Sequence, residues 1–195
     1  MLARLRRCCP CVQEDDHEDG FCMPNYDVEG TRIPVHDLRV ALAPHLEFSA
    51  RDVVWEPIYA LATHGASIAA LRAVLDAHRQ DPRILEVEDS DGRVFGGVWY
   101  GGRDGSCTMV YGGNGADLRV HSAVAPASVV LNQESFSIGL QSATGVALWL
   151  DEALDYGFSS PSPLFQSPGL ATTHNFRCVR LEVWTPASDP ARRHA

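Results

Sequence analysis

The sequence predicts an α/β (α+β) fold in which two antiparallel β-sheets form a central sandwich flanked by a few helices. Many short segments rich in β-branched and aromatic residues alternate with Gly, Pro, Asn and Asp turn signals, a pattern typical of antiparallel sheets. Only two segments place apolar residues at helical spacing. The 195 residues are 45% hydrophobic and 21% charged, which is near the average of folded soluble domains and enough to bury a core without disulfides.

The chain divides into one domain and two tails. Residues 1–30 hold a cysteine cluster and an acidic run but few apolar residues, so we expect disorder there. Apolar periodicity begins near Ile33, and we place the domain at residues 31–186. Residues 187–195 are polar and form the second predicted tail.

Two helices are predicted. The first spans residues 35–42, has Leu38 and Leu42 on one face, and ends before Pro44. The second follows Ser67, a residue type that caps helices, and ends before Pro82. Its apolar residues at helical spacing are Ile68, Leu71, Val74 and Leu75.

The first predicted strands are an apolar run at residues 55–62 and a hairpin at residues 84–99. Asp91-Gly92 is a strong turn signal for that hairpin. In its first strand Leu85 and Val87 alternate with Glu86 and Glu88, and Gly96-Gly97 in the return strand indicates a bulge or close backbone packing.

Six more strands are expected in the second half of the domain, and the last has the clearest alternation. In that strand Val179, Leu181 and Val183 share one face, and Cys178, Arg180, Glu182 and Trp184 share the other. The six segments are residues 107–111, 118–120, 127–131, 135–140, 147–150 and 176–184.

Charge and targeting signals limit the classes of partner and compartment. The net charge of −9 argues against nucleic-acid binding and is compatible with a basic partner surface. No apolar run approaches the roughly 18 residues that a membrane-spanning helix needs, no secretory signal is visible, and Leu2 excludes N-myristoylation. Four of the six cysteines lie in the first 22 residues, which is unlike a disulfide framework. We therefore expect a cytoplasmic protein, and a nuclear location is also compatible with the sequence.

The N-terminal cysteines have three interpretations. Cys8, Cys9 and Cys11 beside Arg4, Arg6 and Arg7 fit S-palmitoylation next to a basic patch, which would hold the chain at an organelle membrane. Cys8 and Cys11 with His17 and Cys22 fit zinc ligands less well, and the third interpretation is an unmodified tail. Replacement of Cys8, Cys9 and Cys11 by Ser should release an acylated protein to the cytosol, whereas unchanged membrane association would contradict acylation.

No catalytic motif, metal site or cofactor site is predicted. The chain lacks a Gly-x-Ser-x-Gly elbow, a papain-like or caspase-like cysteine signature and a Walker A loop, and Gly112 to Gly115 is better explained as a hairpin turn. Cys107 and Cys178 lie in strand-like segments, where we expect buried thiols. A thiol-dependent or carboxylate-dependent enzyme remains the alternative class.

The carboxylates for such an enzyme would be a group close to the end of the chain: Asp151, Glu152, Asp155 and Glu182. Paired carboxylates perform acid–base chemistry or hold a metal. The competing interpretation is structural: Asp151 caps the turn that follows it, and Glu182 pairs with Arg180 or faces solvent. We favour the structural interpretation.

From about Ile33 to Trp184 the chain resembles the TLDc domain family through six segments in family order. They are the opening strand and helix start at 55–68 (WEPIYALATHGASI), the hairpin at 89–97 (DSDGRVFGG), the Ile-Gly step at 137–139 (SIG), the strand and following glycine at 147–157 (ALWLDEALDYG), the loop at 159–165 (SSPSPLF) and the closing strand at 181–184 (LEVW). The chain departs from the family between residues 100 and 115, where neither Tyr-Gly-Gly segment keeps the glutamate of the family's Tyr-Gly-Thr-Gly-Glu pattern.

The resemblance implies a sandwich of two antiparallel sheets and a non-enzymatic role. Several members of the family bind the soluble sector of the vacuolar proton ATPase, and members are linked to protection against oxidative stress, so we expect soluble-sector subunits of that pump as partners. The family-signature positions are Asp151, Gly157, Phe165, Glu182 and Trp184, with roles that are structural first, and we expect the contact residues on loops such as Ser159 to Ser162.

Overall fold

The computed structural model describes residues 38, 41–46, 55–78, 82–101, 105–114, 117–139 and 145–187. Within these ranges the protein is mostly β-structure, with nine strands in one antiparallel sheet of order β1-β9-β2-β3-β4-β5-β6-β7-β8. An additional pairing joins β8 to β9. The strands are β1 (Trp55–Ala60), β2 (Arg83–Asp89), β3 (Val94–Tyr100), β4 (Ser106–Gly112), β5 (Arg119–Leu131), β6 (Ser135–Ile138), β7 (Leu148–Asp151), β8 (Tyr156–Phe158) and β9 (Asn175–Pro186).

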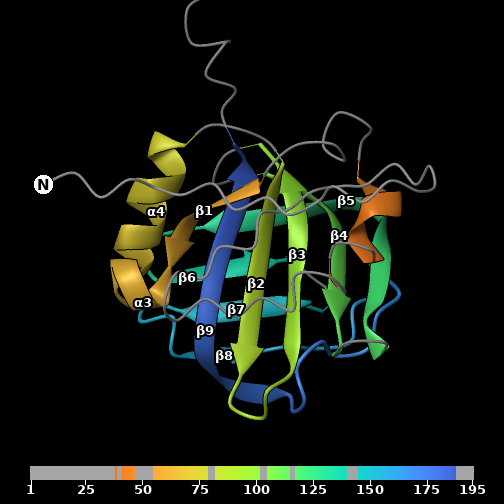
Figure 1. Cartoon of the computed structure of the whole chain (residues 1–195). Coiled ribbons are helices and arrows are strands. Elements are labelled where there is room, and N and C mark those ends of the chain that lie inside the picture. The colour runs from red at the N-terminus through yellow and green to blue at the C-terminus, as the bar shows by residue number, and fades with distance from the viewer. Residues whose placement is uncertain are drawn as a thin grey trace, which may run out of the picture.

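The prediction of two separate sheets is wrong, because two long strands each belong to both layers. β5 pairs with β4 through residues 119–128 and with β6 through residues 129–131. β9 pairs with β8 through residues 175–177 and with β1 and β2 through residues 178–186. The single sheet therefore folds over itself, and β6, β7 and β8 cross behind β9, β2 and β3 (Figure 1).

The helices were partly predicted. α4 (Ile68–Ala77) follows Ser67, but the Ser67 side chain makes no capping hydrogen bond. The Ile68 N–H instead donates to the Glu152 carbonyl at 2.9 Å, which ties the helix to the turn after β7. The predicted strand at 55–62 ends at Ala60, because α3 (Leu61–His64) begins there.

Near the start of the described chain, a 3₁₀ helix, η1 (Ala43–His45), follows the helical residues Ala41 and Leu42. Leu38 and Leu42 are both buried, as their predicted shared face requires. They belong to a hydrophobic cluster on the outer face of the layer formed by β2, β3, β4 and β9. The main core lies on the opposite side of that layer, between the two halves of the sheet and under α4.

The predicted hairpin is confirmed, and a carboxylate organises its turn. Asp89 Oδ1 accepts hydrogen bonds from the backbone N–H groups of Asp91 and Arg93, and Oδ2 accepts one from Thr172. Gly92 has φ +80°, a conformation that favours glycine. The Asp-x-x-Gly motif therefore both shapes the turn and fastens it to the loop before β9.

The predicted alternation of side chains along β9 is wrong at one point, between Cys178 and Arg180. Arg180 pairs with Glu88 and Cys178 with Asp89, so Val179 is an extra residue with no partner in β2. This β-bulge shifts the phase of the strand: Cys178 lies in the main core with Leu181, while Val179 is 53% exposed. The predictions that Val179 shares the face of Leu181 and that Cys178 shares the face of Arg180 are wrong for this reason.

Two further differences concern strands. The predicted strands 118–120 and 127–131 are parts of the continuous strand β5, whose register against β4 shifts between Ser122 and Ala127. β8 was not predicted, because three residues are too few to produce a periodic signal. Among the described residues, no helix combines the length and the apolar composition that crossing a bilayer requires.

Gly157→Ala should lower the free energy of unfolding by about 1–3 kcal/mol. A Cβ at this position would overlap the Trp149 carbonyl oxygen and the Phe176 ring, and the carbonyl belongs to the paired strand β7. Urea denaturation followed by tryptophan fluorescence measures the loss. Gly169→Ala is the control, since its Cβ would meet only the Ser159 carbonyl, at 3.3 Å from the oxygen; equal losses in the two variants would contradict the packing argument.

Candidate functional site

The densest group of charges in the described structure lies on the outer face of β2 and β9. Because Leu85 and Val87 point into the main core, Glu86 and Glu88 point outward from β2. In the register of the two strands, Glu86 is opposite Glu182 and Glu88 is opposite Arg180. We call these four residues, Glu86, Glu88, Arg180 and Glu182, the charge cluster.

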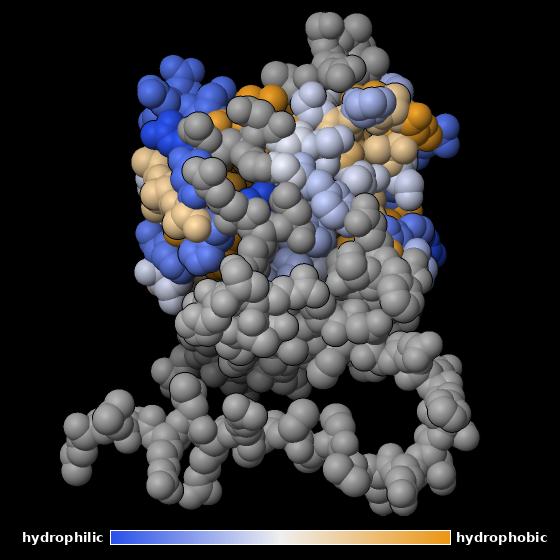
Figure 2. Space-filling view, turned by 90° about the horizontal axis from the view of Figure 1, so that it is seen from above, coloured by the Kyte–Doolittle hydropathy of each residue, from blue (hydrophilic) through white to orange (hydrophobic). Residues whose placement is uncertain are grey.

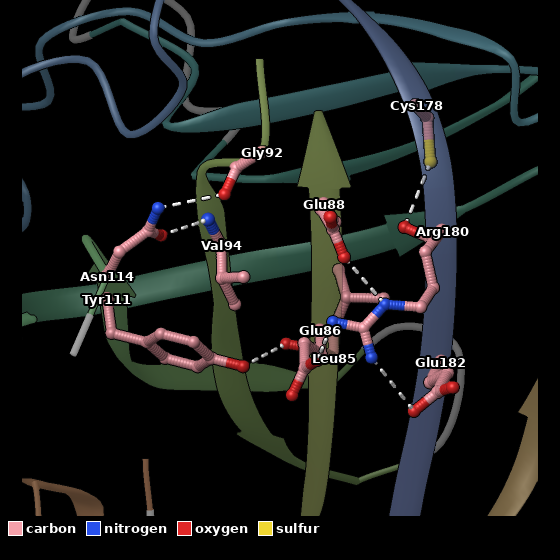
Figure 3. A network of polar contacts seen from close by, with 10 residues as sticks. All are labelled: Leu85, Glu86, Glu88, Gly92, Val94, Tyr111, Asn114, Cys178, Arg180 and Glu182. Atoms are coloured by element: carbon pink, nitrogen blue, oxygen red, sulfur yellow. Dashed lines mark hydrogen bonds and ion pairs between the residues drawn. The ribbon is translucent and has the colours of Figure 1, made fainter. Parts of the chain in front are cut away.

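Arg180 is the only basic residue of the charge cluster and contacts all three carboxylates (Figure 3). Its Nη2 lies 2.8 Å from Glu86 Oε1, its Nε donates to Glu88 Oε2 at 2.9 Å, and its Nη1 lies 3.8 Å from Glu182 Oε2. Two carboxylates directly opposite each other repel. The guanidinium is therefore what allows Glu86 and Glu182 to be neighbours.

Burial changes the proton affinity of the charge cluster. Glu86 and Glu182 are each 1% exposed, whereas Glu88 is partly exposed. Burial raises the pKa of Glu86 to about 8, with Arg180 opposing the rise and Glu182 adding to it. Burial also raises the pKa of Glu182, again against the effect of Arg180. Burial lowers the pKa of Arg180, but the three carboxylates outweigh this and the net pKa is raised.

The side chain of Tyr111 lies next to the charge cluster, close to Leu85 and Glu86. The Tyr111 hydroxyl donates to the Leu85 carbonyl at 2.7 Å, and its ring reaches there from β4 across β3 (Figure 3). Gly96 of β3 lies below it, and a Cβ on Gly96 would overlap the Leu85 carbonyl oxygen. The close backbone packing predicted for Gly96-Gly97 is therefore confirmed. Burial raises the pKa of Tyr111 well above its ordinary value, so the phenol stays protonated.

The predicted grouping of Asp151, Glu152, Asp155 and Glu182 does not form. Glu182 lies in the charge cluster, whereas Asp151 Oδ1 accepts the backbone N–H groups of Asp155 and Tyr156. Asp151 therefore caps the β7–β8 turn, as the structural interpretation predicted, and Glu182 pairs with Arg180 as that interpretation also allowed. Its other option, a solvent-facing Glu182, is wrong, because strand alternation alone does not reveal what covers a face.

The other signature positions have packing environments. Phe165 is 1% exposed in the main core, and Trp184 lies in the outer hydrophobic cluster with Leu38 and Leu42. Glu182 and Trp184 thus lie on the outer face of β9, while Asp151 and Gly157 belong to β7 and β8 in the other layer. The structure does not bring the five positions together into one site.

The Ser159–Ser162 loop presents less surface than predicted. The Ser159 hydroxyl donates to the Ala147 carbonyl at 2.6 Å and accepts the Leu170 N–H at 2.7 Å. Ser162 is also buried, so only the middle of the loop, at Ser160 and Pro161, reaches solvent. Ser159 and Ser162 therefore connect chain segments, and a partner contact through this loop stays a prediction for Ser160 and Pro161.

Both described cysteines are poor candidates for thiol chemistry. Cys107 and Cys178 are free and buried, as predicted. Burial raises the pKa of each thiol to about 12, and neither forms the thiolate that nucleophilic chemistry needs at neutral pH. Among the described residues, no three His, Cys, Asp or Glu side chains are placed to hold a metal. Cys8, Cys9 and Cys11, with the rest of the predicted tail at 1–30, lie outside the described residues, and their acylation stays a prediction.

An open notch of about 650 Å³ lies beside the bulge of β9. Its lining includes Leu61, Leu154, Cys178 and Val179 and the exposed ion pair of Arg177 with Asp155, at 3.1 Å. The neighbouring Tyr156 is 58% exposed. The bulge and the exposed Tyr156 give this part of the molecule apolar surface that no sequence pattern indicated.

Comparison with known families finds one match to part of the chain. The family model of the TLDc domain matches residues 118–186, which contain β5 to β9, the notch residues from Ala153 onward and half of the charge cluster. No curated protein matches the chain. Glu86 and Glu88 lie outside the matched residues, and the sequence signal for them was only an alternation with Leu85 and Val87 that does not distinguish exposed from buried glutamates.

Glu86→Gln should remove a stability loss that the wild type suffers as pH rises. The folded protein binds the Glu86 proton up to about pH 8, whereas an unfolded glutamate releases it near its ordinary pKa of 4.5. Because the pKa of Glu86 is higher in the folded than in the unfolded protein, the contribution of this group to the free energy of unfolding is complete below pH 4.5. That contribution is lost as pH rises to about 8. The variant, which cannot ionise, should therefore gain stability relative to wild type between pH 5 and pH 8.

Thermal unfolding of both proteins at pH 5 and pH 8 measures this difference. Glu134→Gln, in the exposed β5–β6 turn, is the control for the loss of one negative charge. A Glu86→Gln advantage that is the same at both pH values would contradict a buried, protonated Glu86.

Proposed function

Since residues 118–186 are a TLDc domain, we propose that this chain is a non-enzymatic interaction protein that binds soluble-sector subunits of the vacuolar proton ATPase. The observation that carries the proposal is the family match itself, which extends over the second half of the sheet. Through the pump, the protein would support resistance to oxidative stress, as the family resemblance implies.

The charged and polar residues of the fold favour binding over catalysis. Glu86 and Glu182 are buried beside Arg180, Asp151 caps a turn, and both described thiols hold their protons. Each of these groups already has an interaction partner within the fold. The alternative of a thiol-dependent enzyme has lost its two candidate nucleophiles within the described part of the chain.

The notch beside β9 is the surface that we assign to the pump. Val179 and Tyr156 are two of the three most exposed large apolar side chains among the described residues, and Val179 lines the notch while Tyr156 adjoins it. Tyrosine is enriched among the residues that anchor protein interfaces, and the exposed Val179 adds apolar surface to the depression beside it. The net charge of −9 adds a long-range attraction for a basic surface on the partner, so binding should weaken as salt is raised.

Replacing both Tyr156 and Val179 by Ser should weaken binding to the purified soluble sector of the ATPase at least about tenfold, or about 1.4 kcal/mol. The full-length chain is immobilised and the soluble sector is titrated over it by biolayer interferometry. Val124→Ser is the matched control, because Val124 is 61% exposed on β5 and leaves the notch unchanged.

Three outcomes are informative. Loss of binding in the double variant alone supports both the partner and the surface. Loss in Val124→Ser alone would keep the partner but move the contact to β5. A folded wild-type chain that binds no ATPase subunit at micromolar concentration would contradict the proposed function.

A further inference from the structure

The first half of β5 is an edge of the sheet. Residues 119–122 pair with β4 on one side, and β6 pairs with β5 only from Val129 onward. On the side away from β4, the Val124 N–H donates to the Leu164 carbonyl at 2.8 Å. No described strand continues from that point along residues 120–122, so the strand leaves an open edge there.

The register shows which backbone groups face this open edge. The Gly113 N–H donates to the Val94 carbonyl, so odd-numbered residues at this end of β4 direct their backbone groups toward β3. Val110 and Gly112 then direct theirs toward β5, where they pair with His121 and Arg119. The alternate residues Val120 and Ser122 must therefore point their N–H and C=O groups away from β4. Such outward groups are a template for an added strand.

The strand also has a distinct charge. The thirteen residues of β5 include no carboxylate, although the whole chain has a net charge of −9. Arg119 and His121 are the basic residues of this strand, and they lie two positions apart on one face. Burial lowers the pKa of His121, so Arg119 supplies the lasting positive charge. On the right-hand side of Figure 2, which is the side of η1, β4 and β5 in Figure 1, hydrophobic residues reach the surface next to hydrophilic ones.

We propose that the open edge of β5 binds an extended, acidic peptide segment of a partner protein, which pairs with Val120 and Ser122 and places a carboxylate beside Arg119. The inference does not depend on the proton ATPase as partner, because it uses the β5 edge and not the notch beside β9. Main-chain hydrogen bonds supply affinity that is independent of sequence, and the basic face selects for acidic side chains.

A second copy of this chain fits the edge less well. Pairing two β5 strands would place two basic, carboxylate-free segments side by side. The open stretch is also only a few residues long, whereas a stable interface buries about 800 Å² on each partner. A flexible peptide requires less area and adapts to a short edge.

The test selects linear heptapeptides from a phage-displayed random library on the immobilised full-length chain. We expect the enriched peptides to alternate β-branched residues with other types and to contain Asp or Glu. Ser122→Pro removes one outward N–H without breaking a bond to β4, and it should weaken binding of an enriched synthetic peptide at least tenfold. Ser122→Ala keeps the N–H and should bind like wild type, while Arg119→Gln should weaken acidic peptides more than their amide counterparts.

Nuclear magnetic resonance on the wild-type chain keeps the proposal testable if the proline variant does not fold. The synthetic peptide should perturb the amide signals of Val120 and Ser122 more than those of Arg119 and His121, whose N–H groups face β4. No enrichment of peptides, equal binding by Ser122→Pro, or perturbations confined to another surface would each overturn the proposal. A wild-type dimer that Ser122→Pro dissociates would show that the occupant is a second copy and would overturn it too.

Discussion

The pairing of β9 with three other strands holds the two layers of this protein together. β9 lies between β1 and β2 in one layer and continues into a pairing with β8 in the other. The bulge at Val179 lies where the strand passes between these pairings, and a bulge both bends a strand and increases its twist. In a regular strand, Cys178 and Leu181 would point to opposite faces of the sheet, because they are three positions apart. The bulge allows both side chains to lie in the main core. The arrangement of the main core therefore depends on one extra residue.

The same pairing requires the charge cluster to be neutralised. The register that joins β2 to β9 places Glu86 directly opposite Glu182, and both side chains are buried. Arg180 spans the two strands and offsets much of the repulsion, while the raised pKa of Glu86 offsets more of it by keeping a proton. Removal of the guanidinium would leave buried carboxylates without a counter-ion, which is costlier than never having the charges. The cluster is thus a condition of the fold.

The residues that resemble the family are mostly parts of this framework, and the surfaces free for partners lie between them. Asp151, Gly157 and Phe165 shape turns and cores, and the matched segment 118–186 depends on β2, which lies outside it, for the register of β9. Within the described residues we assign partners to two surfaces: the notch beside the bulge, which combines apolar side chains with the Arg177–Asp155 ion pair, and the β5 edge, which offers backbone groups and a positive charge. Their different chemistry suits two different kinds of partner segment.

The sequence by itself determined the local elements and the character of the protein. The Asp-Gly turn of the hairpin, the helix at 68–77, the burial of Cys107, and the capping role of Asp151 follow from short-range patterns, because turns, caps and periodicity depend on neighbouring residues. Only the tertiary structure decided that one sheet folds over in place of two, that Glu86 and Glu182 are buried together, and that β5 has an open edge. These features depend on register and on contacts between strands far apart in the chain, such as Glu86 with Arg180, which no local pattern encodes.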